Sequence, residues 1–138
     1  MNDPVNRRKN ERIYLGKTEV ISADLRYNKT ETSVLNVRIK DLSEGGLGFL
    51  VKRPELPVIK EDKYLLLENI TGSRDLHFLK SSKLIVRWLL DIDGLNHISF
   101  GCEFIDLETS KRKKLKDYVS TRMVISSWSV YSDDQTIG

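Results

Sequence analysis

Cysteine and histidine are scarce in this chain. The single cysteine, Cys102, has no second cysteine with which it could form an internal disulfide. The two histidines, His77 and His97, lie in separate segments, and neither has a partner at the spacing of a metal site. Cys102 lies within the alternating segment 99–104, so we expect a small core thiol rather than a nucleophile. These shortages exclude a disulfide-stabilised fold and argue against a metal centre.

Long hydrophobic runs and an apolar leader are also missing. No apolar segment approaches the roughly 18 residues needed to cross a bilayer, and the first residues are polar and basic, unlike a signal peptide. Hydrophobic residues make up 39% and charged residues 31% of the 138 residues, which suits one soluble globular domain. A chain of this length can bury a core without metal or disulfide. We therefore expect a single cytoplasmic domain without a membrane span.

Alternation of apolar and polar residues is abundant and predicts half-buried strands. Six segments show it, or a short apolar run, and turn residues such as Asp93-Gly94 separate them. The phase puts Trp88 on one face with Leu84 and Val86, as a core or barrel-rim aromatic. The apolar positions, strand by strand, are Ile21, Ala23, Leu25 and Tyr27; Leu35, Val37 and Ile39; Leu47, Phe49 and Val51; Tyr64 to Leu67; Leu84, Val86 and Trp88; and Ile98, Phe100, Cys102 and Phe104.

The period changes near Asp106. Leu115, Tyr118, Val119 and Met123 recur at helical spacing and predict one buried helix face, while the basic run 111–116 lies mostly on the other faces. Six short strands followed by one helix predict a mainly β protein, a six-stranded antiparallel β-barrel with a C-terminal α-helix. We predict three parts: a flexible N-terminal arm over 1–16, the barrel with its helix over 17–125, and an unpatterned tail over 126–138.

Two short stretches carry the chemistry. The arm contains Arg-x-x-x-Arg at Arg8 and Arg12, and the connection between the second and third predicted strands reads Asp-x-Ser-x-x-Gly at Asp41, Ser43 and Gly46. Guanidinium groups bind phosphate bidentately and pair with the O6 and N7 edge of guanine. A carboxylate, a hydroxyl and a glycine add acceptors, a donor and close backbone approach. Together these residues suit an anionic guanine nucleotide.

These motifs, in this order and on this strand pattern, resemble the PilZ domain, a bacterial receptor for cyclic di-GMP (c-di-GMP), over roughly residues 6–124. Gly46-Leu47-Gly48-Phe49 resembles the third strand of that family, and 101–105 resembles the Gly-x-x-Phe segment of its last strand. The resemblance implies that Arg8 and Arg12 each grip a phosphate or the Hoogsteen edge of a guanine. It also implies that Ser43 donates its hydroxyl to the ligand.

Further roles follow from the same resemblance. Asp41 would accept from a guanine N–H or hold an arginine in position. Gly46 would let the backbone approach the ligand, and Gly45 belongs to the same bend, where glycine tolerates a positive φ. Arg7 is an extra guanidinium beside the motif, which the family associates with an intercalated ligand pair. The ligand would order the arm and so signal to a partner protein, whose identity and pathway (motility or biofilm regulation, for example) the sequence does not give.

Several alternatives remain open on sequence alone. Asp41 and Ser43 also suit a side-chain-stabilised turn, which is compatible with binding. Arg38 and Arg87, on outward faces of their strands, either extend the ligand site or are surface charges. The chain could also be a PilZ-like protein-interaction module that does not bind nucleotide. A nucleic-acid-binding barrel is supported by the pI of about 9.0 and by the basic run 111–116. It is weakened because the strand aromatics fall on the apolar faces and leave no exposed aromatic platform.

Motifs of catalysis are missing as well. The chain has neither a P-loop nor a nucleophile elbow, and its carboxylates are scattered. A ligand held by arginines and glycines, without a positioned base or metal, is bound rather than processed. We therefore expect a protein that is not an enzyme and needs no cofactor or metal.

Overall fold

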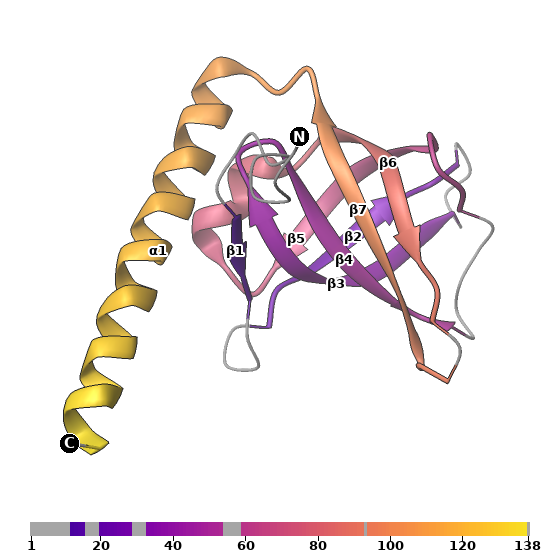
Figure 1. Cartoon of the computed structure of the whole chain (residues 1–138). Coiled ribbons are helices and arrows are strands. Elements are labelled where there is room, and N and C mark those ends of the chain that lie inside the picture. The colour runs from indigo at the N-terminus through magenta and orange to yellow at the C-terminus, as the bar shows by residue number, and fades with distance from the viewer. Residues whose placement is uncertain (1–11, 16–19, 29–32, 54–58, 93, 138) are drawn as a thin grey trace, which may run out of the picture.

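The fold is a closed antiparallel barrel with one C-terminal helix (Figure 1), as predicted. The computed structural model describes residues 12–15, 20–28, 33–53, 59–92 and 94–137, and from residue 124 onward the backbone alone. Strands follow the order β1-β3-β2-β5-β6-β7-β4, and β3 also pairs with β4, so β2 to β7 close a six-stranded barrel. Their bounds are Arg12–Tyr14 (β1), Ser22–Arg26 (β2), Val34–Ser43 (β3), Gly46–Lys52 (β4), Tyr64–Thr71 (β5), Ser82–Leu90 (β6) and His97–Ile105 (β7).

Residues 12–14, predicted as part of a flexible arm, form strand β1. This strand runs antiparallel to the end of β3, with Arg12 opposite Ser43. The N–H of Leu15 also donates to the carbonyl of Lys40 over 2.9 Å. Strand β2 pairs with the first half of β3. The long strand β3 therefore pairs with β2 over its first half and with β1 at its end. Pairing with β3 therefore brings Arg12 beside the Asp-x-Ser-x-x-Gly stretch.

The core fills the inside of the barrel, as the alternation predicts. Phe49 of β4 and Phe100 of β7 are fully buried and stack with ring centroids 4.9 Å apart. Cys102 is also buried, at 8% exposure, which confirms the expected core thiol. Burying a large apolar side chain contributes roughly 1.5–3 kcal/mol to stability, so the stacked rings of Phe49 and Phe100 help to hold β4 against β7.

Two helical elements cover the barrel. A 3-10 helix, η3 (Arg74–Leu79), was not predicted, and it buries Leu76 and Leu79. Helix α1 (Thr109–Ile137) packs its first turns on β1, β3 and η3 and then extends past the barrel (Figure 1). Leu115 and Val119 are buried, as expected. The helix continues through residues 126–137, which were predicted as an unpatterned tail.

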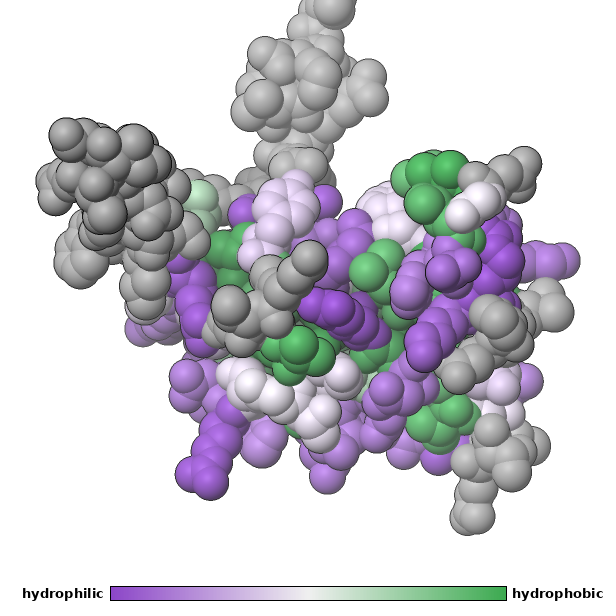
Figure 2. Space-filling model, turned by 90° about the horizontal axis from the view of Figure 1, so that it is seen from below, coloured by the Kyte–Doolittle hydropathy of each residue, from purple (hydrophilic) through white to green (hydrophobic). Residues whose placement is uncertain are grey.

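The surface view in Figure 2 is mainly hydrophilic, with small separate hydrophobic areas. Within the part of the chain that the structure describes, no helix is both long and apolar enough to cross a membrane.

Candidate functional site

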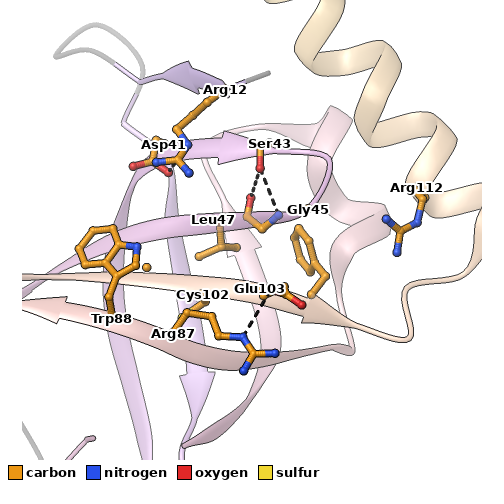
Figure 3. A pocket seen from close by; sticks show the side chains of 13 residues that line it. Arg12, Asp41, Ser43, Gly45, Leu47, Arg87, Trp88, Cys102, Glu103 and Arg112 are labelled. Carbon is orange, nitrogen blue, oxygen red and sulfur yellow. Dashed lines mark hydrogen bonds and ion pairs between the residues drawn. The ribbon is translucent and has the colours of Figure 1, made fainter. Parts of the chain in front are cut away.

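A cavity of about 460 Å³ opens on the outer wall of the barrel, where β3 turns into β4 (Figure 3). This volume falls within the roughly 300–1,000 Å³ of small-molecule sites. The cavity brings residues of both predicted motifs together with residues from β6, β7 and α1. Its charged and hydroxyl-bearing lining residues are Arg12, Asp41, Ser43, Arg87, Glu103 and Arg112, and the others are Gly45, Gly46, Leu47, Trp88, Gly101, Cys102 and Phe104.

Asp41 is the buried acid of the site, at 3% exposure. Its Oδ2 accepts from Lys40 Nζ over 2.9 Å, and its Oδ1 lies 3.9 Å from Arg12 Nε. The longer distance is an ion pair without a hydrogen bond. Arg12 Nε is buried and has no hydrogen-bond partner among the described residues. Arg12 is therefore held near the cavity by charge, with donors still available to an acceptor.

Ser43 closes the turn between β3 and β4. Its Oγ accepts from the N–H of Gly46 over 3.2 Å and lies 3.3 Å from the carbonyl of Gly46, to which it donates. The carbonyl of Gly45 accepts from the N–H of Phe104 in β7 over 2.9 Å. These bonds match the turn interpretation of the motif, and they hold the loop at the cavity wall.

The glycines of this region are needed for space. Among the described glycines, positive φ occurs at Gly72 and Gly94, so the turn at Gly45 and Gly46 does not use the tolerance of glycine for this conformation. A Cβ on Gly46 would instead collide with the carbonyl of Cys102 across the strand pair. The close approach of β4 to β7 therefore depends on a residue without a side chain.

Four neighbouring strands contribute one residue each to a single row across the wall. Asp41 is paired with Gly48, Gly48 with Gly101, and Gly101 with Trp88. A Cβ on Gly48 would lie 2.5 Å from Asp41 Oδ2, and a Cβ on Gly101 would lie within the indole of Trp88. The carboxylate and the indole thus lie over two glycines, and both line the cavity.

Trp88 lies on the outer wall, so its predicted place with Leu84 and Val86 was wrong. The pairing register of β6 with β7 shifts between Val86 and Trp88, which inserts Arg87 as an extra residue. A β-bulge of this kind re-aims the side chains that follow it. Trp88 is consequently 37% exposed at the cavity, with Lys40 Nζ 5.1 Å from its ring centroid.

A second bulge does the same for Asp41. The register of β3 with β4 shifts between Ile39 and Asp41. Unbroken alternation would have put Asp41 on the inner face with Val37 and Ile39. Instead Leu42 takes the inner face at 0% exposure, and Asp41 faces the cavity. Both walls of the site are therefore placed by bulges.

The arginines of the site come from three elements. Arg87 Nε lies 3.4 Å from Glu103 Oε2, and Arg112 extends from α1 (Figure 3). The sequence leaves undecided whether Arg87 belongs to the site or is a surface charge, and it places Arg112 in a basic run expected to be solvated. The helical spacing between Arg112 and Leu115 was the available signal that Arg112 faces the barrel.

Arg38 is exposed and does not line the cavity. The predicted site residues Arg7 and Arg8 lie outside the described residues.

Cys102 lines the cavity without being a candidate nucleophile. Burial, together with the negative charge of Asp41, raises the pKa of its thiol to about 12. The thiol is therefore neutral near pH 7. Among the described residues no three His, Cys, Asp or Glu side chains gather as a metal site would require.

Known structures share this fold at low sequence identity. The K. pneumonia MrkH–c-di-GMP complex matches with TM-score 0.70 and 18% identity, over 88% of this chain and 55% of that chain. Bacillus subtilis MotI/DgrA, an inhibitor of motility, matches with TM-score 0.64 and 15% identity, over 86% and 51%. This chain thus spans about half the length of both. The PilZ domain of YcgR from Escherichia coli with c-di-GMP matches with TM-score 0.63 and 15% identity, over 90% and 97%.

A search among curated proteins found no match. The family model of the PilZ domain matches residues 6–121, which include both motifs and every strand of the barrel. This chain therefore belongs to the PilZ domain family.

Proposed function

We propose that this protein is a non-catalytic receptor that binds c-di-GMP in the cavity beside the Asp-x-Ser-x-x-Gly turn. The observation that carries the proposal is that Arg12, from one motif, and Asp41, Ser43 and Gly46, from the other, line one cavity. Family membership supports the ligand, as do the related structures of MrkH and YcgR, which hold c-di-GMP.

The chemistry of the cavity suits each part of the ligand. Within the described residues the buried Nε of Arg12 has no hydrogen-bond partner, and Arg12 offers its guanidinium to a phosphate or a guanine edge. Trp88 offers an exposed indole face on which a guanine stacks. Lys40 Nζ, which is bound to Asp41 Oδ2 and lies 5.1 Å from the centroid of that ring, adds positive charge beside the stacking face. Arg8, four residues before Arg12, would supply the second guanidinium of the motif.

The signal would pass through the arm. Strand β1 already holds Arg12 on the barrel, so the ligand would act mainly on residues 6–11, which carry Arg7 and Arg8. Ordering this segment presents a new surface to a partner protein, and the ligand shifts that equilibrium only by its differential affinity for the two states. Hydrogen exchange over residues 6–11 should slow at saturating c-di-GMP; unchanged exchange would contradict this route.

Titration calorimetry with c-di-GMP tests the binding, and separate titrations with GTP and cyclic di-AMP are the controls. Charged hydrogen bonds contribute about 1.5–3 kcal/mol each. Arg12→Ala should therefore weaken binding by about tenfold to hundredfold. Arg38→Ala is the matched control, because Arg38 is an exposed arginine of β3 that does not line the cavity. The stoichiometry would show whether Arg7 accompanies one ligand or an intercalated pair.

A negative result has a definite meaning. No heat with c-di-GMP up to about a hundred micromolar, where even binding worth roughly 6 kcal/mol would begin to show, would overturn the receptor proposal. The protein would then be a PilZ-like interaction module that does not bind nucleotide.

A further inference from the structure

We propose that Arg112 of helix α1 is a further ligand-binding residue of the cavity, and that through it the C-terminal helix senses the bound nucleotide. This inference rests on the proposed function. It concerns the basic run 111–116, to which neither motif assigns a role.

Arg112 is the cation of the basic run that lines the cavity, and helical phase explains why it lies against the barrel. Arg112, Leu115 and Val119 follow spacings of three and four, which places them on one face of α1. Leu115 and Val119 are buried against the barrel at 0% and 3% exposure. Arg112 and Lys111 are half-buried at the same face, whereas Lys113, Lys114 and Lys116 are exposed. Of the two half-buried cations, Arg112 lines the cavity and Lys111 does not.

The place that Arg112 meets is the cavity itself. In Figure 3 Arg112 and Arg12 lie on opposite sides of Ser43, and both line the cavity. The Arg112 N–H donates to the carbonyl of Glu108 over 2.9 Å, which closes the first turn of α1. The guanidinium is therefore presented from a formed helical turn rather than from a loop.

Arg112 differs from the other two arginines of the cavity in its partners. Arg12 lies 3.9 Å from Asp41, and Arg87 lies 3.4 Å from Glu103. Within the part of the chain that the structure describes, Arg112 has no acidic partner. The three arginines exceed the two lining carboxylates by one charge, and Arg112 supplies that excess.

An unpaired guanidinium in a polar cavity fits a phosphodiester, which it can bind with two parallel hydrogen bonds. A ligand bound by both Arg12 and Arg112 would tie β1 to α1 across the cavity. The first turns of α1 would then become more rigid when the ligand binds. Because α1 extends past the barrel (Figure 1), the helix is placed to carry the change to a partner.

Calorimetry on three variants tests the role of Arg112. Arg112→Ala should weaken c-di-GMP binding at least tenfold, and Arg112→Lys should recover part of the loss, because it keeps the charge but not the planar fork. Lys113→Ala, the adjacent exposed cation of the same run, should change the affinity less than twofold. A second measurement is hydrogen exchange over residues 109–116, which should slow with ligand in the wild type and not in Arg112→Ala at saturation.

The outcomes distinguish this inference from the proposal beneath it. If Arg12→Ala loses binding while Arg112→Ala binds like Lys113→Ala, the role of Arg112 is overturned and the receptor function stands. If the wild-type protein does not bind c-di-GMP, both are overturned. Thermal melting of each variant without ligand is the control for folding. An unchanged Tm means that a lost affinity comes from the site. A lowered Tm means that the fold is damaged, and this would count against Arg112 as a ligand residue.

Discussion

At the scale of single residues, two glycines determine where the side chains of the cavity can lie. Gly48 leaves room for the carboxylate of Asp41, and Gly101 leaves room for the indole of Trp88. Neither adopts a positive φ, so the requirement is steric. A methyl group at either position would press on a side chain of the site rather than strain the backbone.

Gly101→Ala should push Trp88 away from the wall. Overpacking of this kind costs about 1–3 kcal/mol of unfolding free energy, and the affinity for c-di-GMP should fall because the stacking face moves. Fluorescence of a Trp128→Phe background, in which Trp88 is the only remaining tryptophan, would follow both unfolding in denaturant and the environment of the indole.

A double-mutant cycle provides the control. In a Trp88→Ala background the added methyl group has no indole to meet, so Gly101→Ala should then cost much less. An equal cost in both backgrounds would rule out the contact with Trp88 as the reason for glycine.

At the scale of elements, the short strand β1 holds Arg12 in place. Its two other residues face opposite ways: Ile13 is buried at 7% exposure opposite Leu42, and Tyr14 is 63% exposed. Apolar burial on one face, together with pairing to β3, is therefore what fixes the strand on the barrel.

Ile13→Ala should loosen β1 while the barrel stays folded. Truncating a buried isoleucine costs about 2–5 kcal/mol, enough to release a three-residue strand from a sheet edge. The amide of Leu15, bonded to Lys40, should exchange faster, and c-di-GMP affinity should fall because Arg12 is no longer positioned. Tyr14→Ala, in the same strand, should stay within about 0.5 kcal/mol of the wild type; similar effects of the two substitutions would contradict this account.

At the scale of the whole molecule, the cavity exists only in the folded chain. Its lining comes from β1, β3, β4, β6, β7 and α1, which are far apart in sequence. A ligand that binds this cavity therefore binds the native state and not the unfolded one, and binding must stabilise the fold by linkage.

Thermal melts should show this linkage directly. At a c-di-GMP concentration a hundred times its Kd, the gain is about 2.7 kcal/mol, which for a domain of this size raises Tm by about 5–15 °C. The increase should shrink in 1 M salt, which screens the arginines from the phosphates. GTP at the same concentration is the control, and an equal shift with GTP would point to general anion binding instead of recognition of the cyclic dinucleotide.

Part of the fold was predictable because the pattern of a strand is local. Side chains alternate with period two, so the inner faces around Val37, Phe49 and Phe100 follow from neighbouring residues alone. The two motifs were likewise visible as short stretches. Strand β1 was missed because three residues are too few to show a period, and η3 because residues 74–79 carry no strand or long-helix pattern.

The sequence by itself therefore determined the six strands, the buried face of the helix and the motif residues Asp41, Ser43 and Gly46, since local periodicity and spacing specify them. Only the tertiary structure decided that Trp88, Arg87 and Arg112 join them in one cavity. Two bulges turn Asp41 and Trp88 outward, and the docking of α1 brings Arg112 to the cavity. Bulges and docking depend on which strands and helices meet, and contacts between distant segments leave no local pattern in the chain.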